Sequence, residues 1–169
     1  MDVLDAIFTR RSIRKYSGEP VLEEDIDTVL KAGQHAPSAH NKQPWDFIIV
    51  KDKDKFESIA KVHTYAKMLP QAEVCVVVCG DKNKQPMTGF LIEDCSAAIE
   101  NMLLAAHGLG LGAVWCGLYP VTHLTKGMKK IFGLPEYIIP IGMVVIGQKG
   151  EERKADNRFD PTKLHYEKW

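Results

Sequence analysis

Apolar residues recur at helical spacing in five segments of the chain. In residues 94–107, Cys95, Ala98, Ile99 and Met102 fall on one face, and further alanines and leucines extend the apolar surface. The same pattern predicts helices over residues 2–11, 23–36, 54–62, 94–107 and 122–132. A helix as apolar as residues 94–107 needs cover on several sides, so we expect it at the centre of the domain or against a second subunit.

Four shorter segments carry apolar runs typical of strands, over residues 46–50, 74–79, 114–118 and 138–147. The continuous run at 74–79 indicates a strand covered on both faces, and Pro140 interrupts the last strand because proline cannot donate to a sheet. The glycine-rich segment 108–112 follows a helix and precedes a strand, the reverse of a dinucleotide-binding loop, so we interpret it as a helix stop and a tight turn. The alternation of helices and strands allows either an α/β or an α+β fold.

Length, charge and chemistry narrow the class of protein. A chain of 169 residues, 45% of them hydrophobic, fits one domain with a substantial core. Its 22 basic and 22 acidic residues leave no net field toward nucleic acid or an anionic membrane. The acidic start and the lack of an apolar run of roughly 18 residues predict a cytoplasmic protein without a signal peptide or membrane span. The cysteines and histidines show no ligand spacing, so we expect reduced, buried thiols and no metal.

Arginine is distributed unevenly along the chain. Three of the five arginines, Arg10, Arg11 and Arg14, lie with Ser12 in one short segment, and the other two, Arg153 and Arg158, lie near the far end. Because guanidinium groups pair with phosphate or carboxylate in a planar fork, the two groups are candidates to converge on one anion. The alternative is that the first group closes a helix and complements its C-terminal dipole.

A second polar segment, residues 37–45, lies between a predicted helix and a predicted strand. It offers hydroxyl, amide and imidazole groups, either for a well-capped turn or for a ligand. Together with the arginine segment it supplies cations for a phosphate, amides for the edges of a heterocycle and hydroxyls for a sugar-like chain. A hydrolase built on Ser38 and His40 is a weaker alternative, because residues two apart in a loop seldom meet in nucleophile and base geometry.

The order of several blocks resembles the FMN-dependent nitroreductase family from end to end: RRSIRKY, PSAHNKQPWDF, AKMLPQAEVCVVVCGD, and the apolar helix followed by GLGLGAVWCG. The resemblance implies an α+β, nitroreductase-like three-layer fold with a central, mostly antiparallel sheet flanked by helices. It implies a single FMN-binding domain over residues 1–169, in which 150–169 form a tail that wraps the partner subunit. It also implies a homodimer with FMN at the subunit interface, each FMN bound by residues of both chains.

The resemblance assigns the cofactor-binding residues as well. From one subunit, the arginines and serine of the first segment are implied near the phosphate and ribityl chain, with Arg14 reaching toward the ring. Arg158 of the tail is implied at the phosphate, with Lys154 a weaker match. Lys67 matches a position near the N1 and O2 edge of the flavin, and the backbone of residues 116–118 faces the N5 and O4 edge. The implied FMN-binding residues are Arg10, Arg11, Ser12 and Arg14 from one subunit, Pro37, Ser38, Ala39, Asn41 and Gln43 from the other, and in addition Lys67, Cys116, Gly117, Leu118 and Arg158.

The activity implied is that of an NAD(P)H-dependent oxidoreductase. Hydride from NADH or NADPH would pass through flavin N5 to an electron-poor acceptor, such as a nitroaromatic or a quinone, by a ping-pong mechanism without a catalytic side chain. The alternative is a flavin-binding protein that acts as a store, a sensor or a partner of another electron donor, without NAD(P)H turnover. His40 stands where relatives often carry threonine or serine, and the chain lacks a long insertion, so the acceptor and the choice between NADH and NADPH stay open.

Overall fold

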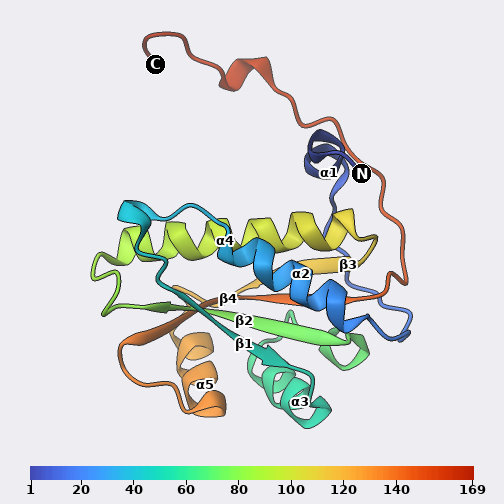
Figure 1. Cartoon of the computed structure of the whole chain (residues 1–169), viewed down its shortest axis with the longest axis vertical. Coiled ribbons are helices and arrows are strands. Elements are labelled where there is room, and N and C mark those ends of the chain that lie inside the picture. Colours follow the sequence, from blue (N-terminus) through green and yellow to red (C-terminus); the bar gives the residue numbers. More distant parts are fainter.

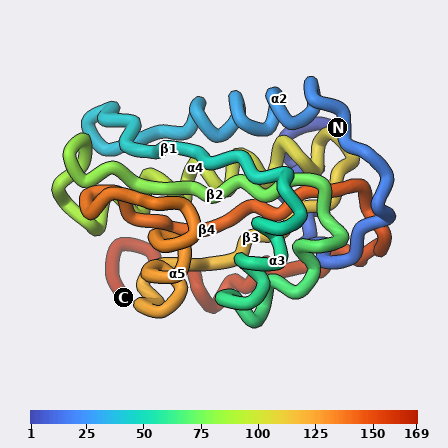
Figure 2. The backbone as a smooth tube through the Cα atoms, turned by 90° about the horizontal axis from the view of Figure 1, so that it is seen from below, coloured from blue at the N-terminus to red at the C-terminus, as the bar shows by residue number.

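A four-stranded sheet forms the middle of the computed structural model, which describes residues 1–169 (Figure 1). The strands are β1 (Trp45–Val50), β2 (Val74–Asp81), β3 (Gly112–Gly117) and β4 (Ile138–Gly147), and they lie in the order β1-β2-β4-β3. Every neighbouring pair is antiparallel, and the backbone trace in Figure 2 shows the strands side by side in this order. The fold class is therefore α+β, which the hydrophobic pattern alone left open.

Helices cover both faces of the sheet and give the protein three layers (Figure 1). Helix α4 (Thr88–Gly108) lies on one face and α2 (Glu23–Gln34) packs against it, while α3 (Lys53–Val62) and α5 (Thr122–Phe132) cover the other face. The short helix α1 (Val3–Thr9) packs against α4. Three 3₁₀ turns complete the elements: η1 (Ala39–Asn41), η2 (Leu69–Gln71) and η3 (Pro161–Lys163).

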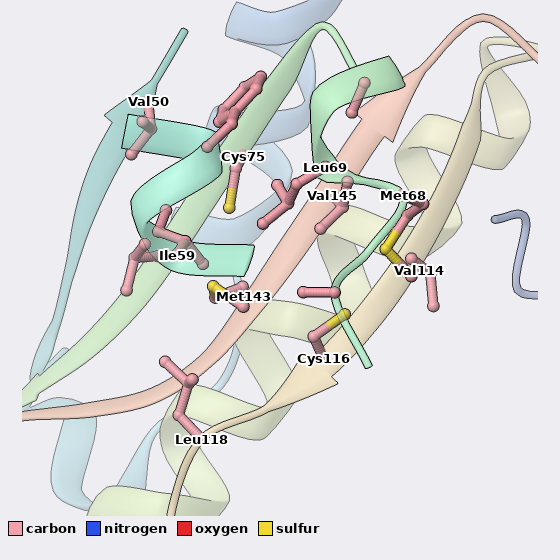
Figure 3. Close-up of a cluster of buried hydrophobic side chains, with 14 of the residues drawn as sticks. Val50, Ile59, Met68, Leu69, Cys75, Val114, Cys116, Leu118, Met143 and Val145 are labelled. Carbon is pink, nitrogen blue, oxygen red and sulfur yellow. The ribbon is translucent and has the colours of Figure 1, made fainter. Parts of the chain in front are cut away.

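Strand β2 explains why the core has two halves. Successive side chains of a strand point to opposite faces, so Cys75 and Val77 pack toward α3 and α5, whereas Val76 and Val78 pack toward α2 and α4. Figure 3 shows side chains from the half of the core on the side of α3 and α5, among them Ile59 of α3 and Met143 of β4. A strand buried on both faces confirms the prediction from its continuous apolar run.

Several element boundaries differ from the predicted ones, and Pro140 does not interrupt its strand. Helix α4 begins at Thr88 instead of residue 94. The sequence hides this earlier start, because Met87 makes no capping hydrogen bond and Gly89 weakens the helical pattern. Helix α1 ends at Thr9, so the arginines follow the helix, and no basic side chain lies in its last turn. Pro140 is tolerated within β4 because it lies beyond the end of β3 and at a register shift against β2.

The two ends of the chain are less covered than the sheet and its helices. Only Ala6 of α1 is buried, and its apolar residues Val3, Leu4 and Phe8 are exposed. After Gly150 the chain leaves the sheet and passes α1 before it ends far from the rest of the molecule (Figure 1). Its large residues are exposed, with Trp169 fully so. The wrap of this tail around a second subunit stays a prediction. None of the helices combines the length and the apolar character that crossing a membrane requires.

Candidate functional site

The two groups of arginines meet in one polar pocket of about 510 Å³. Its lining contains five basic side chains and one carboxylate, and no hydrophobic residue. Because the basic groups come from the segment after α1 and from the tail, the chain folds its two ends together around this pocket. The lining residues are Arg11, Ser12, Arg14, Arg153, Lys154, Asp156 and Arg158.

Backbone pairing and one carboxylate bring these two segments together. The Gly150 N–H donates to the carbonyl of Lys15 over 2.9 Å, next to a β-bridge between Tyr16 and Lys149. The Glu151 carboxylate accepts a hydrogen bond from the Arg14 backbone N–H over 2.8 Å. That hydrogen bond, followed by contacts with Arg153, lowers the pKa of Glu151, so this acceptor stays ionised at neutral pH.

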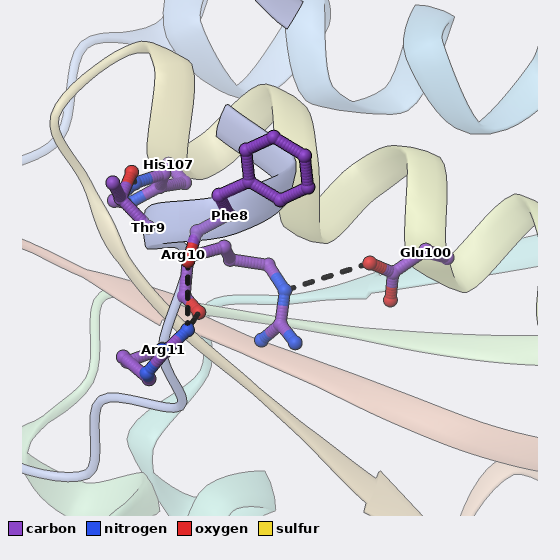
Figure 4. Close-up of polar contacts among 6 residues, drawn as sticks. All are labelled: Phe8, Thr9, Arg10, Arg11, Glu100 and His107. Atoms are coloured by element: carbon purple, nitrogen blue, oxygen red, sulfur yellow. Dashed lines mark hydrogen bonds and ion pairs between the residues drawn. The ribbon is translucent and has the colours of Figure 1, made fainter. Parts of the chain in front are cut away.

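Arg11 is committed to holding the tail. Its guanidinium donates to the carbonyl oxygens of Lys154 and Asp156, each over 3.2 Å, and to the carbonyl of Arg10 over 2.6 Å. Arg10 points elsewhere: Figure 4 shows it turned toward Glu100 of α4, with 3.5 Å between Nε and Oε1. Arg10 therefore does not line the polar pocket. It lines a neighbouring groove between α1 and the tail, of about 530 Å³.

Helix α1 is held to the end of α4 by a second polar contact. The Thr9 hydroxyl lies 2.8 Å from Nε2 of His107, and the two side chains lie side by side in Figure 4. The same hydroxyl hydrogen-bonds to the carbonyl of Asp5. Burial, and then the charge of Lys149, lower the pKa of His107. The arginine segment that follows Thr9 is thereby anchored at the C-terminal end of α4.

Arg14 connects the polar pocket to two further pockets. One, of about 630 Å³, contains Lys67 and Tyr65, and the other, of about 360 Å³, contains Cys116, Gly117 and His63. The structure thus brings Lys67 and the Cys116–Gly117 backbone to the two sides of Arg14. Leu118 behaves differently from the expectation, because its side chain is fully buried and its N–H donates to Ile141. Neither group of Leu118 is free to meet a ligand in this arrangement.

The loop over residues 37–43 lies at the opposite end of α4. The Asp94 carboxylate near the start of α4 accepts a hydrogen bond from the Ala39 N–H over 2.8 Å, whereas α1 is anchored at His107, roughly 20 Å further along the helix at 1.5 Å per residue. The loop residues line none of the three pockets around Arg14. A single chain therefore does not bring the two predicted halves of the site together.

Backbone strain marks this loop. His40, Asn41 and Gln43 all have φ between 46° and 54°, a region that side chains other than glycine rarely adopt and that clusters at functional sites. The Ser38 hydroxyl accepts a hydrogen bond from the Gln43 N–H over 3.0 Å, and the Gln43 amide donates to Asn41. These contacts give Ser38 no base, so the loop lacks the nucleophile and base pair that a hydrolase would need.

The four cysteines are free and buried. Burial raises the pKa of the Cys116 thiol to about 11, so this thiol is neutral at physiological pH and is a poor nucleophile. Nowhere do three or more metal-ligating side chains gather closely enough to hold an ion.

Two residues that support the site, His63 and Asp94, were not predicted from the sequence. His63 holds the carbonyl of Gly117, and Asp94 holds the N–H of Ala39. Asp94 could have been identified from the sequence, since a carboxylate on a helix as apolar as α4 is unexpected unless it has a buried partner. His63 could not, because its partner is far away in the sequence.

Comparison with known proteins places the chain. Residues 7–64 and 55–148 match the profile of the Nitroreductase family. A protein of Methanothermobacter thermautotrophicus, provisionally named an NADH dehydrogenase/NAD(P)H nitroreductase, is 46% identical over 100% of this chain and 88% of its own. A structure of the same provisional name from Bacteroides thetaiotaomicron is 40% identical, with a TM-score of 0.94 over 99% of this chain and 98% of that one.

A third protein, provisionally named a nitroreductase, was solved in complex with FMN and comes from Desulfovibrio desulfuricans. It is 29% identical, with a TM-score of 0.87 over 100% of this chain and 98% of that one. Together with the family profile, these likenesses confirm the resemblance seen in the ordered sequence blocks. The chain belongs to the nitroreductase family.

Proposed function

We propose that this chain is an FMN-dependent oxidoreductase, which uses NADH or NADPH to reduce an electron-poor acceptor such as a nitroaromatic or a quinone. The observation that carries the proposal is the convergence of both ends of the chain on one polar pocket, which continues past Arg14 toward Lys67 and Gly117. The relatives named for NAD(P)H and the similar structure solved with FMN support this choice of donor and cofactor.

The polar pocket fits the phosphate of FMN. Arg14, Lys154 and Arg158 line it and form no ion pair with any carboxylate of the chain. Cations without a carboxylate partner are available to a phosphate, and guanidinium groups can bind it through two parallel hydrogen bonds. Arg11 contributes indirectly, because it fixes the tail that carries Lys154 and Arg158.

The pockets on either side of Arg14 suit a flat ring. Tyr65 and Trp115 supply aromatic surface there, and Lys67 supplies a cation. FMN, when bound, supplies the ring atom that takes hydride from the nicotinamide and returns it to the acceptor. The protein's part is to bind and orient: Lys67 and Arg14 favour negative charge at the ring, and the Cys116–Gly117 backbone offers hydrogen bonds at the opposite edge. The neutral, buried Cys116 thiol takes no part as a nucleophile.

We further propose that a second copy of the chain completes the site. The Ser38–Gln43 loop lies at the other end of α4, and the apolar residues of α1 and of the tail are exposed. In a twofold dimer each copy would give its arginine half to one site and its loop half to the other, so that two equal sites form. The tail after Gly150 would cover the partner subunit and bury its aromatic residues.

The visible spectrum of the purified protein tests the proposal. We expect a yellow protein, or a colourless one that keeps a yellow colour after FMN is added and the excess is removed by gel filtration, and bleaching when NADH or NADPH is added without oxygen. A protein that binds FMN but is bleached by neither donor would be a flavin-binding protein without NAD(P)H turnover. A protein that takes up no FMN would contradict the flavin proposal altogether.

A further inference from the structure

Three buried side chains carry a polar atom without a hydrogen-bond partner: His63, Gln85 and Asp94. Such atoms are uncommon in native proteins, because a buried polar group has lost its water and needs a replacement. Each of these side chains uses another polar atom to contact a segment of the candidate site. The contacts are with Gly117, Lys42 and Ala39, respectively. Among them, His63 lines the pocket that contains Arg14, Cys116 and Gly117.

His63 ties together two segments that are far apart in the sequence. It follows the last residue of α3, and its side chain is buried, with the whole residue only 4% exposed. Its carbonyl accepts a hydrogen bond from the Ala66 N–H over 2.9 Å, which shapes the turn that carries Lys67. Its ring reaches the other segment, where Nε2 lies 3.0 Å from the carbonyl oxygen of Gly117. One residue thus sets the spacing between the Lys67 side and the Gly117 side.

The hydrogen bond to Gly117 fixes a peptide plane. The peptide that joins Gly117 to Leu118 contains the carbonyl held by His63 and the N–H that donates to Ile141 over 3.0 Å. Both polar ends of this peptide are therefore held, one from each side. Gly117 lies at the end of the edge strand β3, with no atom within 4 Å of the place where a Cβ would be. Gly117 has no side chain to pack, so its position depends on the pairing with Gly142 in β4 and on these two hydrogen bonds.

We propose that His63 is a positioning residue, whose Nε2–H clamps the Gly117 carbonyl and so fixes the Cys116–Gly117 backbone against the bound flavin. This inference rests on the proposed function, because it concerns the same site. In the neutral ring that donates through Nε2, Nδ1 is an acceptor left without a donor. A leucine here would fill the core without an unpaired polar atom. If the residue served only for packing, leucine would therefore be the better choice.

The test compares four variants with the wild-type protein by FMN titration and by the midpoint potential of bound FMN. His63→Leu and His63→Phe remove the donor while they keep apolar volume, and His63→Gln keeps an N–H donor near the position of Nε2. His35→Leu is the matched control, since His35 is exposed at the end of α2 and lines none of the pockets around Arg14. Thermal unfolding of the FMN-free proteins reports any effect on the fold alone.

We expect His63→Leu and His63→Phe to weaken binding of oxidised FMN about tenfold, the effect of one lost hydrogen bond. Binding of reduced FMN should weaken about tenfold more, which equals a fall of about 30 mV in the two-electron potential. His63→Gln should stay within about threefold of the wild type, as a retained donor predicts, and His35→Leu should match the wild type.

Two outcomes would overturn the inference while the proposed function stands. The first is wild-type affinity and potential in both donorless variants. The second is an equal loss in His63→Gln and in the donorless variants, which would make the ring's shape and not its donor the cause. If His63→Leu does not fold, His63→Phe and His63→Gln give the same comparison. A wild-type protein that binds no FMN would overturn the proposed function, and the inference with it.

Discussion

Apolar residues are buried in the region of the sheet and its four covering helices, whereas they are exposed in the two chain ends. On the two faces of the sheet, large side chains such as Phe56, Ile99 and Met143 are fully buried. In α1 and the tail, Phe8 is 66% exposed and Trp169 fully exposed. The same kind of hydrophobic pattern therefore makes a core in one region and leaves a surface in the other. The candidate site lies where the two regions meet, since Arg14 of the N-terminal segment lines one pocket with Cys116 and Gly117 of β3.

The difference teaches that the chain has two levels of organisation. The sheet and its helices satisfy their own apolar surface, so we expect them to fold independently of a second subunit. The ends hold polar groups for a ligand and apolar groups for a partner. Changes in the first region should therefore act on stability, and changes in the second should act on binding and assembly.

The largest expected effect is on the core. Phe56→Ala removes a fully buried ring from α3 and should lower the free energy of unfolding by about 3–5 kcal/mol. Phe159→Ala is the matched change in the tail, where the ring is 71% exposed in the single chain; it should change the free energy of unfolding of the monomer by no more than about 0.5 kcal/mol and should act on dimerisation instead. Urea denaturation at a protein concentration low enough to dissociate the dimer measures both. Similar losses in the two variants would erase the distinction between the regions.

Truncation after Gly150 should separate binding from folding. It removes Arg153, Lys154 and Arg158, three of the five basic residues of the polar pocket. We expect FMN affinity to fall at least about 100-fold, because several charged hydrogen bonds are lost together, and dimerisation to weaken as well. Circular dichroism should still report a cooperatively folded protein. A truncated chain that stays a flavin-replete dimer in sedimentation would show that the tail is dispensable.

A single tail arginine should give a smaller loss of the same kind. Arg158→Ala removes one unpaired cation from the pocket and should weaken FMN binding about 10- to 100-fold, the effect of a hydrogen bond to a charged group. Lys130→Ala is the control, because this lysine is exposed on α5 and forms no ion pair. Titration of the FMN-free proteins measures the two affinities. Equal values would mean that the phosphate of FMN does not bind in this pocket.

The smallest expected effect at physiological pH is the response of the buried thiols to alkali, because it develops only above pH 9. Burial raises the pKa of Cys79 and Cys95 to about 12 and that of Cys116 to about 11, above the ordinary value of 9.0. A pKa raised by folding gives stability that is complete below pH 9 and is lost as the pH rises through 11 and 12. Urea midpoints should therefore fall above pH 9.

Thiol labelling checks the same point at lower pH. At pH 8 the native protein should react negligibly with a thiol reagent, and all four cysteines should react once it is unfolded in urea. Rapid labelling of the native protein would mean that the region around the sheet opens as readily as the ends.

The sequence predicted the elements better than their partners. Hydrophobic periodicity placed the helices and strands, but it gave neither the antiparallel order of the sheet nor the start of α4, where a weak cap and Gly89 hide the signal. The uneven use of arginine predicted that the two chain ends converge, and they do. It did not predict that Arg10 would pair with Glu100 or that Arg11 would hold the tail, because such contacts depend on distances across the fold. His63 escaped notice for the same reason.

The complementation of two defective chains tests most directly whether each site is built from two copies. One chain carries Arg14→Ala and Arg158→Ala, and the other carries Ser38→Ala and Asn41→Ala in the loop at the opposite end of α4. Each variant alone should retain little FMN. After the two are unfolded together and refolded, each mixed dimer should contain one intact site, so the account predicts that FMN binding reappears. A refolded mixture that binds no more FMN than the separate variants would contradict a site shared between subunits.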